Sequence, residues 1–382
     1  MSWFFLSLIA LICWSGSDFF SKLGSHPRDK FSHWKMVMAV GAVMGLHAAY
    51  EMIVNDVPVA FLDILTYMPA SALYILSMVF GYVGLRYIEL SVSSPICNCS
   101  GAVAAVLCFL LLGELPPALG WVGVALIAVG LVALSIVEQR ESDEAKDLRR
   151  AEGIKYSRSA LALALPLLYC LIDALGSFID IVILGPKAEG GILSIVPSMF
   201  DRARDYLGIS AGSVAEAQAV IEAAELAPGS VGASALEAAE ALLLSIDDMA
   251  ASISNVCYEL TFLAMGVFAA IYVFLIKRQR LVPTAEVLAE EGATPRRHLV
   301  RHELPKLAAG VCETAGQFAY IFAFAYAPTD AAAGFAAAII SSYCALSVLL
   351  SRLLLKEKLS LKHYLAILVA FAGILILGFL DM

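Results

Sequence analysis

The chain contains few charged residues: Asp, Glu, Lys and Arg make up 15% of its 382 residues, against 60% for hydrophobic types. No stretch of basic residues interleaved with aromatic ones is present, which argues against a nucleic-acid-binding protein. The net charge of -9 comes mainly from residues 186–251, where three basic residues stand against ten acidic ones. So apolar a composition is not that of an ordinary soluble domain.

The sequence also lacks the motifs of soluble enzymes. Glycine-rich phosphate loops and HExxH or CxxC zinc patterns do not occur, and no Ser/His/Asp set can be placed in one aqueous site. The eight cysteines all lie in apolar runs, and only Cys97 and Cys99 stand close together. We interpret them as packing residues and expect no disulfide framework, metal, cofactor or enzymatic activity.

Long hydrophobic runs dominate the rest of the chain. About 20 apolar residues in a helix cross the ~30 Å hydrocarbon core of a bilayer, and many runs here have that length. The sequence therefore predicts a multi-pass protein of the cell (cytoplasmic) membrane, embedded in the lipid bilayer. The predicted spanning helices are residues 3–24, 33–54, 64–87, 90–112, 117–137, 160–184, 252–276, 304–326, 331–355 and 361–380.

One segment of the sequence occurs twice. Residues 110–134 return 243 positions later as residues 353–377, with six of the 25 aligned positions identical. Both copies begin with three leucines, reach a glutamate (Glu114, Glu357) and share a glycine (Gly130, Gly373). Because the neighbouring hydrophobic runs also pair off, five in each half, we predict an internally duplicated membrane protein, and such folds are mostly transporters.

The duplication defines the predicted domains. Residues 1–137 form the first five-helix repeat, residues 138–158 a charged linker, and residues 159–382 the second repeat. An acidic, alanine-rich insert at residues 186–251 lies between the sixth and seventh helices and has no counterpart in the first half.

The insert is predicted to be helical. Ser213 with Glu216, and Ser234 with Glu237, fit the capping box that begins a helix, and apolar residues recur at helical spacing behind each. Two interpretations stay open for this segment: a small helical cap on the membrane face, or a docking site for a partner or a cationic ligand.

The distribution of Lys and Arg predicts the orientation. The loops after the odd-numbered helices, with their helix-end residues, hold 22 of them, and the opposite loops hold three, all in the insert. The positive-inside rule then places the basic loops in the cytoplasm and both termini and the insert outside.

Acidic residues occur inside the predicted spans. Asp173 and Glu313 stand near the middle of their helices, where an ionised side chain costs ~3 kcal/mol and needs a partner or water. No Lys or Arg stands in the middle of any predicted span. This charge pattern favours protons or organic cations over anions as ligands, with Asp173 and Glu313 carrying the coupling.

Helical spacing places further polar residues on the same faces, as with Gln317 and Tyr320, which follow Glu313 at i+4 and i+7. Asp18, Asp180 and Glu259 lie nearer helix ends and could instead reach the membrane interface, and Tyr67 and Tyr74 could be packing aromatics. Asn98 follows Pro95, where the helix is either locally broken or only kinked. The candidate substrate- and ion-binding residues are Trp14, Asp18, Tyr74, Asn98, Tyr169, Asp173, Glu259, Glu313, Gln317 and Tyr320.

Several short motifs accompany this layout: Trp14-Ser-Gly-Ser-Asp18, Gly84-Leu-Arg-Tyr87, and the leucine-rich stretches that end at Glu114 and Glu357. With ten helices in a five-plus-five arrangement, the chain resembles the EamA-type branch of the drug/metabolite transporter superfamily. The resemblance implies secondary active transport of a small molecule by alternating access around a central cavity, built from inverted repeats.

The expected fold is thus an all-α membrane protein with ten transmembrane helices in two inverted five-helix repeats, plus a small helical insert outside the membrane. The expected function is transport of a small metabolite or organic cation, with protons as candidate coupling ions and efflux or uptake both open. The alternative is a non-transporting membrane scaffold or receptor that acts through the acidic insert.

Overall fold

The computed structural model describes residues 2–24, 31–84, 97–113, 116–141, 160–187, 191–227, 230–282, 294–355 and 360–380. These residues form helices and connecting turns, with no strand among them, so the all-α prediction is confirmed. The first half contains α1 (Trp3–Gly24), α2 (Ser32–Val54), α3 (Phe61–Gly84), α5 (Ser100–Leu111) and α6 (Ala118–Glu141).

The second half begins with α8 (Ala160–Leu184) and has one long helix that enters the bundle from outside. The insert contributes η1 (Ile192–Ile195), α9 (Met199–Tyr206) and α10 (Ala211–Leu226). The remaining elements are α11 (Ala233–Ala270), η2 (Ile271–Ile276), α13 (Pro295–His298), η3 (Leu299–Glu303), α14 (Leu304–Ala325), α15 (Asp330–Ser341), α16 (Tyr343–Leu355) and α17 (Leu361–Phe379).

Eight helices in the described part are long and apolar enough to cross a membrane. The fourth and fifth predicted spans correspond to two shorter apolar helices, Ser100–Leu111 and Ala118–Leu134. Outside the described residues lie the start of the fourth span with Pro95, the acids Glu114 and Glu357, and residues 142–158 of the charged linker. The multi-pass prediction is confirmed, and a total of ten spans stays a prediction.

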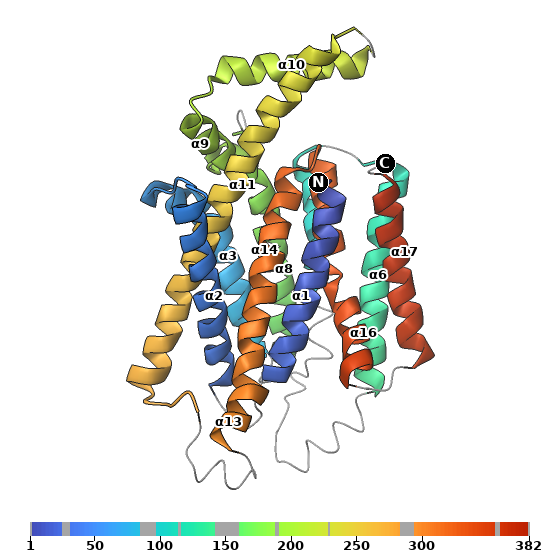
Figure 1. The fold of residues 1–382 in the computed structure, drawn as a ribbon. Helices are drawn as coiled ribbons and strands as arrows, with labels where there is room; N and C mark the ends of the chain where they lie inside the picture. The colour runs from blue at the N-terminus through green and yellow to red at the C-terminus, as the bar shows by residue number, and fades with distance from the viewer. Residues whose placement is uncertain are drawn as a thin grey trace.

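Both chain termini lie at the end of the bundle that carries α9 and α10, and α13 lies at the opposite end (Figure 1). We call these the termini end and the basic end. α1 runs from the termini end to the basic end, and α2 returns, so the position of a residue along its helix gives its depth in the bundle.

Two predicted spans continue further outward than the sequence analysis gave them. The seventh helix begins at Ala233 rather than 252, because residues 233–251 are rich in Ala, Leu and Glu and contain no Gly or Pro to end a helix. The eighth begins at 304 as predicted for α14, but α13 and η3 extend it to Pro295, where Thr294 caps the first turn and a proline suits it. The apolar runs of the sequence predicted only the part of each helix that is hydrophobic enough to lie within the membrane.

Both predicted capping boxes are also wrong, although the two helices behind them are present. α10 starts three residues early, where Ser210 Oγ accepts a hydrogen bond from the Ser213 backbone N–H at 3.1 Å. α11 starts after Gly232, with no side-chain cap.

The ninth predicted helix is interrupted at Ser342, which separates α15 from α16. The Ser342 hydroxyl donates to the Ile339 carbonyl at 2.6 Å, and that of Ser341 donates to Ala338 at 3.2 Å. Such local bonds compete with the helical ladder and favour a bend. In the first half, Asn98 and Cys99 form a turn before α5, and the residues ahead of Cys97, with Pro95, lie outside the described part of the chain.

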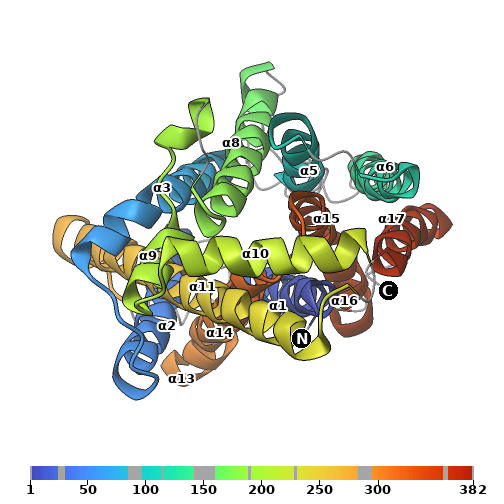
Figure 2. The same cartoon turned by 90° about the horizontal axis from the view of Figure 1, so that it is seen from above.

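Helices of the two halves pack in pairs. α1 packs on α14 and α8 on α3, while α2 packs on α11, α5 on α15, and α6 on α17. Figure 2, a view along the bundle, shows these partners side by side. If each helix is replaced by its equivalent in the other half, the same five pairs result. The α1–α14 pair then becomes α8–α3, and each of the other three pairs joins two equivalent helices.

The glycine shared by the two repeated segments lies in the α6–α17 contact. A Cβ atom on Gly130 would lie 2.8 Å from the carbonyl oxygen of Ala366 and 2.7 Å from the backbone nitrogen of Ala370. One on Gly373 would lie 2.6 Å from the oxygen of Gly123 and 2.9 Å from the nitrogen of Ile127. Because Gly123 and Ile127 stand 243 positions before Ala366 and Ala370, each glycine contacts the equivalent residues of the other copy.

The insert is held to the bundle by a buried acid at the start of α3. Asp63 is 0% exposed. Its carboxylate accepts from Arg202 Nε at 2.6 Å, from the Tyr206 hydroxyl at 2.7 Å and from the Ala60 backbone N–H at 2.7 Å. α9 is therefore fixed to the bundle by directed bonds as well as by apolar packing.

Arg202→Gln is expected to loosen α9, because Asp63 then keeps a buried charge without its cation, a loss of about 1–3 kcal/mol. Hydrogen exchange of residues 199–206 should become faster. Arg204→Gln is the matched control: Arg204 pairs with the surface acids Asp201 and Asp205, and such pairs contribute about 0–1 kcal/mol. Equal exchange rates in the two variants would contradict this role of Asp63.

The hydrogen bond to Asp63 raises the pKa of the Tyr206 hydroxyl above its ordinary value. A raised pKa means that the bond contributes its full stability below about pH 10 and loses it as the pH rises through the folded-state pKa. We therefore expect the attachment of α9 to be insensitive to pH across the physiological range.

Candidate functional site

A central cavity of about 340 Å³ lies between the two halves. Helices α1, α2, α3 and α5 line it from the first half, and α8, α11, α14 and α15 line it from the second. Nine of the ten candidate residues border the cavity: Trp14, Asp18, Tyr74, Asn98, Tyr169, Asp173, Glu313, Gln317 and Tyr320.

Three carboxylates face this cavity. Asp18, Asp173 and Glu313 are each partly exposed to it rather than fully enclosed. The Ser77 hydroxyl donates to Asp173 Oδ1 at 3.1 Å, and Ser17 hydrogen-bonds to Glu313. Hydroxyl donors together with access to the cavity reduce the cost of keeping such acids within the membrane.

The cavity also has an edge lined by basic residue types, which the charge pattern at the centres of the spans did not indicate. Lys22, at the last turn of α1, and His33, at the first turn of α2, both line it near the basic end. The expectation of an acidic cavity with no basic counter-charge is thus wrong at this edge, because only the middles of the helices were considered. Further from this edge, the cavity is lined by the acids Asp18, Asp173 and Glu313.

Aromatic rings form one wall of the cavity. The Trp14 ring lies 5.2 Å from that of Tyr320 and 6.0 Å from that of Tyr343, between ring centroids. A glycine on α14 makes room for it: a Cβ on Gly316 would lie 2.4 Å from Trp14 Cδ1. A flat, apolar ligand or a cation can stack against such a wall.

Two hydrogen-bond donors in the wall have no partner within the described part of the chain. They are Trp14 Nε1 and Gln317 Nε2. Gln317 is 3% exposed, and an unsatisfied buried donor costs about 1–3 kcal/mol. A ligand that offers an acceptor to these atoms would remove that cost.

On the termini side of the cavity, a buried network joins α3 to α8 and α14. The Tyr67 hydroxyl donates to Asp180 Oδ1 at 2.6 Å, and both residues are 0% exposed. The Tyr74 hydroxyl is hydrogen-bonded to that of Tyr320 and donates to Ser177 Oγ at 3.3 Å. The alternative that Asp180 reaches the membrane interface is therefore wrong, because a tyrosine from a neighbouring helix pairs with it inside the bundle.

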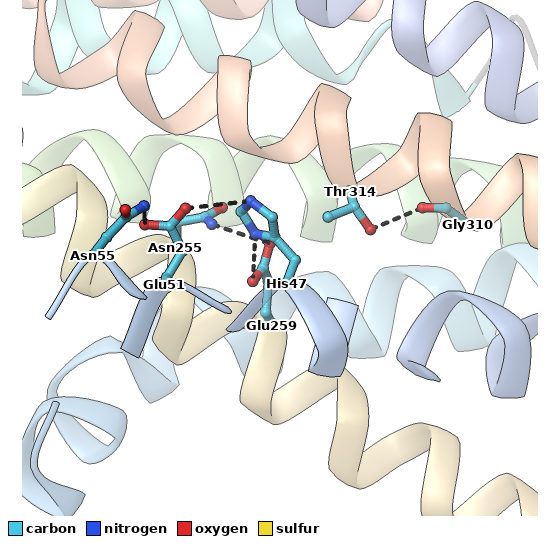
Figure 3. Close-up of polar contacts among 7 residues, drawn as sticks. All are labelled: His47, Glu51, Asn55, Asn255, Glu259, Gly310 and Thr314. Atoms are coloured by element: carbon cyan, nitrogen blue, oxygen red, sulfur yellow. Dashed lines mark hydrogen bonds and ion pairs between the residues drawn. The ribbon is translucent and has the colours of Figure 1, made fainter. Parts of the chain in front are cut away.

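Glu259 is the candidate residue that does not line the cavity. It lies on α11 facing α2, where His47 Nδ1 is 2.8 Å from its Oε1, and Asn255 Nδ2 donates to the same oxygen at 3.0 Å (Figure 3). The interface alternative is wrong for Glu259 as well, since the side chain is 0% exposed.

Sequence reasoning missed several lining residues. Tyr258, Ser341 and Tyr343 border the cavity, the last two on either side of the break at Ser342. The signal available was the polar stretch Ser341-Ser342-Tyr343 within an apolar run, which resembles the polar stretch at Asn98 in the first half.

The model of the EamA-like transporter family matches residues 1–136 and 252–379. These ranges cover well over half of the chain, so the chain belongs to the EamA-like transporter family. Proteins of this family are transporters rather than enzymes, and the chain is accordingly a multi-pass membrane transporter. The residues between the two matched ranges contain the charged linker, α8 and the whole insert.

No curated protein matches the chain significantly. Among the solved structures, one described only as "Crystal structure of protein" aligns with 99% of this chain and 97% of its own length. Its TM-score is 0.57 at 11% sequence identity. At that identity the likeness concerns the fold alone.

Proposed function

We propose that the chain is a secondary active transporter that binds an organic cation or a small polar metabolite with a cationic group in the central cavity. The single observation that carries this proposal is the position of Asp18, Asp173 and Glu313 around one cavity whose wall is aromatic. Carboxylates would compensate the charge of the ligand, and Trp14 and Tyr320 would stack on its apolar part.

Alternating access around this cavity is the proposed mechanism. The lining extends to Lys22 and His33 near the basic end, while the Tyr67–Asp180 pair closes the bundle toward the termini end. With the basic end in the cytoplasm, as the distribution of Lys and Arg favours, we infer that this arrangement is the inward-facing state of the cycle. Opening the other side would require the Tyr74–Tyr320 and Tyr67–Asp180 contacts to separate.

The pairing of helices supports inverted repeats as the source of this motion. Reciprocal contacts at Gly130 and Gly373 place α6 and α17 as a symmetric pair. The α1–α14 contact and the α8–α3 contact are equivalent under the repeat. One rocking movement could therefore open the cavity to either side of the membrane in turn.

A thermal-shift screen of the purified protein tests the ligand class. The panel would contain amines, amino acids, nucleotide sugars and cationic dyes, each at two pH values. A ligand that binds only the folded state at 100 times its Kd adds about 2.7 kcal/mol of stability. We expect amines or cationic dyes to raise the melting temperature. Shifts confined to anionic compounds would contradict the proposed cation site.

A further inference from the structure

A second polar cluster lies outside the cavity, at the contact between α2 and α11. His47 and Glu51 stand four residues apart on α2, and Asn55, four residues further, directly follows the end of that helix (Figure 3). His47 Nδ1 lies 2.8 Å and 3.0 Å from the two carboxylate oxygens of Glu259 on α11. His47 Nε2 lies 3.5 Å from Oε1 of Glu51. Each ring nitrogen therefore faces a carboxylate.

This geometry selects a protonation state. A neutral imidazole carries a hydrogen on one nitrogen and a lone pair on the other. Between Glu51 and Glu259, a neutral ring would turn its lone pair toward a carboxylate. An imidazolium instead offers a donor to both acids. The step that forms it is the addition of one proton from water to the ring lone pair, with no other bond changed in the protein.

The cluster connects a buried acid to the termini end of the bundle. The Glu259 side chain is 0% exposed, whereas those of Glu51 and His47 are 12% and 29% exposed. Asn55, the exposed residue that follows α2, donates to Glu51 Oε2 at 2.9 Å. Since Glu51 and His47 are themselves partly exposed and neither lines the cavity, a proton would reach His47 through Glu51 or directly, without passing the cavity.

Within the described residues, the other groups around His47 are aromatic rings and an amide. α14 contributes the Phe318 ring, 5.9 Å away in edge-on contact, and Tyr50 of α2 stacks at 6.5 Å. Asn255 of α11 donates to Glu259. The titratable groups that face His47 are therefore Glu51 from its own helix and Glu259 from α11, two carboxylates against one imidazole.

The same two helices touch again closer to the basic end, through glycines. A Cβ on Gly41 would lie 2.8 Å from the carbonyl oxygen of Phe262, and one on Gly266 would lie 3.2 Å from Gly41 Cα. At this depth the two backbones approach each other with no side chain between them, while the His47 cluster joins α2 and α11 nearer the termini end.

We propose that His47, Glu51 and Glu259 form a proton-binding site, separate from the cavity, that fastens α2 of the first half to α11 of the second. With the proton bound, the imidazolium bridges the two carboxylates. When it leaves, a neutral ring stands between two acids, and the helices separate more readily on their glycine contact. The proton-binding site itself does not depend on the proposed function. Only its control of a movement between the two halves rests on that function.

Magnetic resonance with ¹⁵N-labelled histidine, on the full chain in nanodiscs at neutral pH, tests the site directly. The ring nitrogen signals distinguish an imidazolium from a neutral ring. We expect an imidazolium signal that disappears in His47→Gln. It should become neutral in the double variant Glu51→Gln with Glu259→Gln, and persist in Glu216→Gln, which changes an exposed acid on α10. A neutral signal for His47 in the wild type would overturn the proposal.

A second readout covers the case in which the double variant does not fold. Glu51→Gln alone changes a partly exposed residue, and the backbone of residues 47–55 should then exchange hydrogen at least about tenfold faster. Unchanged exchange would overturn the fastening role. Neither measurement uses a transported solute, so a chain that moved no solute would defeat the proposed function and leave this site standing.

Discussion

Glu313→Gln is expected to reduce transport of an organic cation at least about tenfold, equivalent to about 1.4 kcal/mol of lost stabilisation. A cation that enters the cavity gives up water, and the carboxylates of Glu313 and Asp173 offset that loss. Glutamine keeps the shape of the side chain and its hydrogen bond with Ser17, so the variant removes the charge and little else. The measurement is initial uptake by proteoliposomes, normalised to folded protein.

Asp173→Asn is the companion variant, since the Ser77 hydroxyl can still donate to the amide oxygen. Asp18→Asn should have a smaller effect, because Lys22 stands one turn away on the same helix and already balances part of that charge. Glu216→Gln, on the exposed face of α10, is the matched control for the loss of one acid. Wild-type uptake in folded Glu313→Gln and Asp173→Asn proteins would contradict the assigned roles.

Alanine at Gly130 or Gly373 is expected to destabilise the protein by about 1–3 kcal/mol, as overpacking of a tight contact does. The added methyl group would meet backbone atoms of the opposite helix, which cannot rotate away as a side chain can. Because the two glycines contact equivalent residues, the two variants should lower the melting temperature by similar amounts.

Gly232→Ala is the control for this pair, since nothing lies within contact of a Cβ at that position. A melting temperature for Gly130→Ala equal to that of the control would mean that α6 and α17 are not packed through these glycines. A large effect at only one of the two positions would contradict the reciprocal contact.

The sequence predicted the helices well where an apolar run alone decides their ends. α1 and α8 begin and end at the predicted residues, 3–24 and 160–184. It failed where other forces decide: α11 continues outward because its polar residues still favour a helix, and Ser342 interrupts a segment whose mean hydropathy is that of one continuous span. Hydropathy does not report either effect.

For the site, helical periodicity placed Glu313, Gln317 and Tyr320 on one face, and the structure turns that face toward the cavity. Glu259 shows the limit of this reasoning. It directly follows Tyr258, which lines the cavity, but successive residues of a helix point about 100° apart, so Glu259 faces α2 instead. The spacing of residues along a helix shows which of them share a face. Which neighbouring helix that face contacts depends on packing between segments distant in the sequence.

The central claim is that this chain moves a cationic solute across a bilayer by way of the acidic cavity. Proteoliposomes carrying the purified protein, with an imposed pH gradient, would be tested with ethidium and with the strongest ligand from the thermal-shift screen. The account predicts accumulation faster than in protein-free liposomes, with the excess lost in a folded protein that combines Asp173→Asn and Glu313→Gln. Equal rates with and without protein, or an unchanged excess in the double variant, would contradict it.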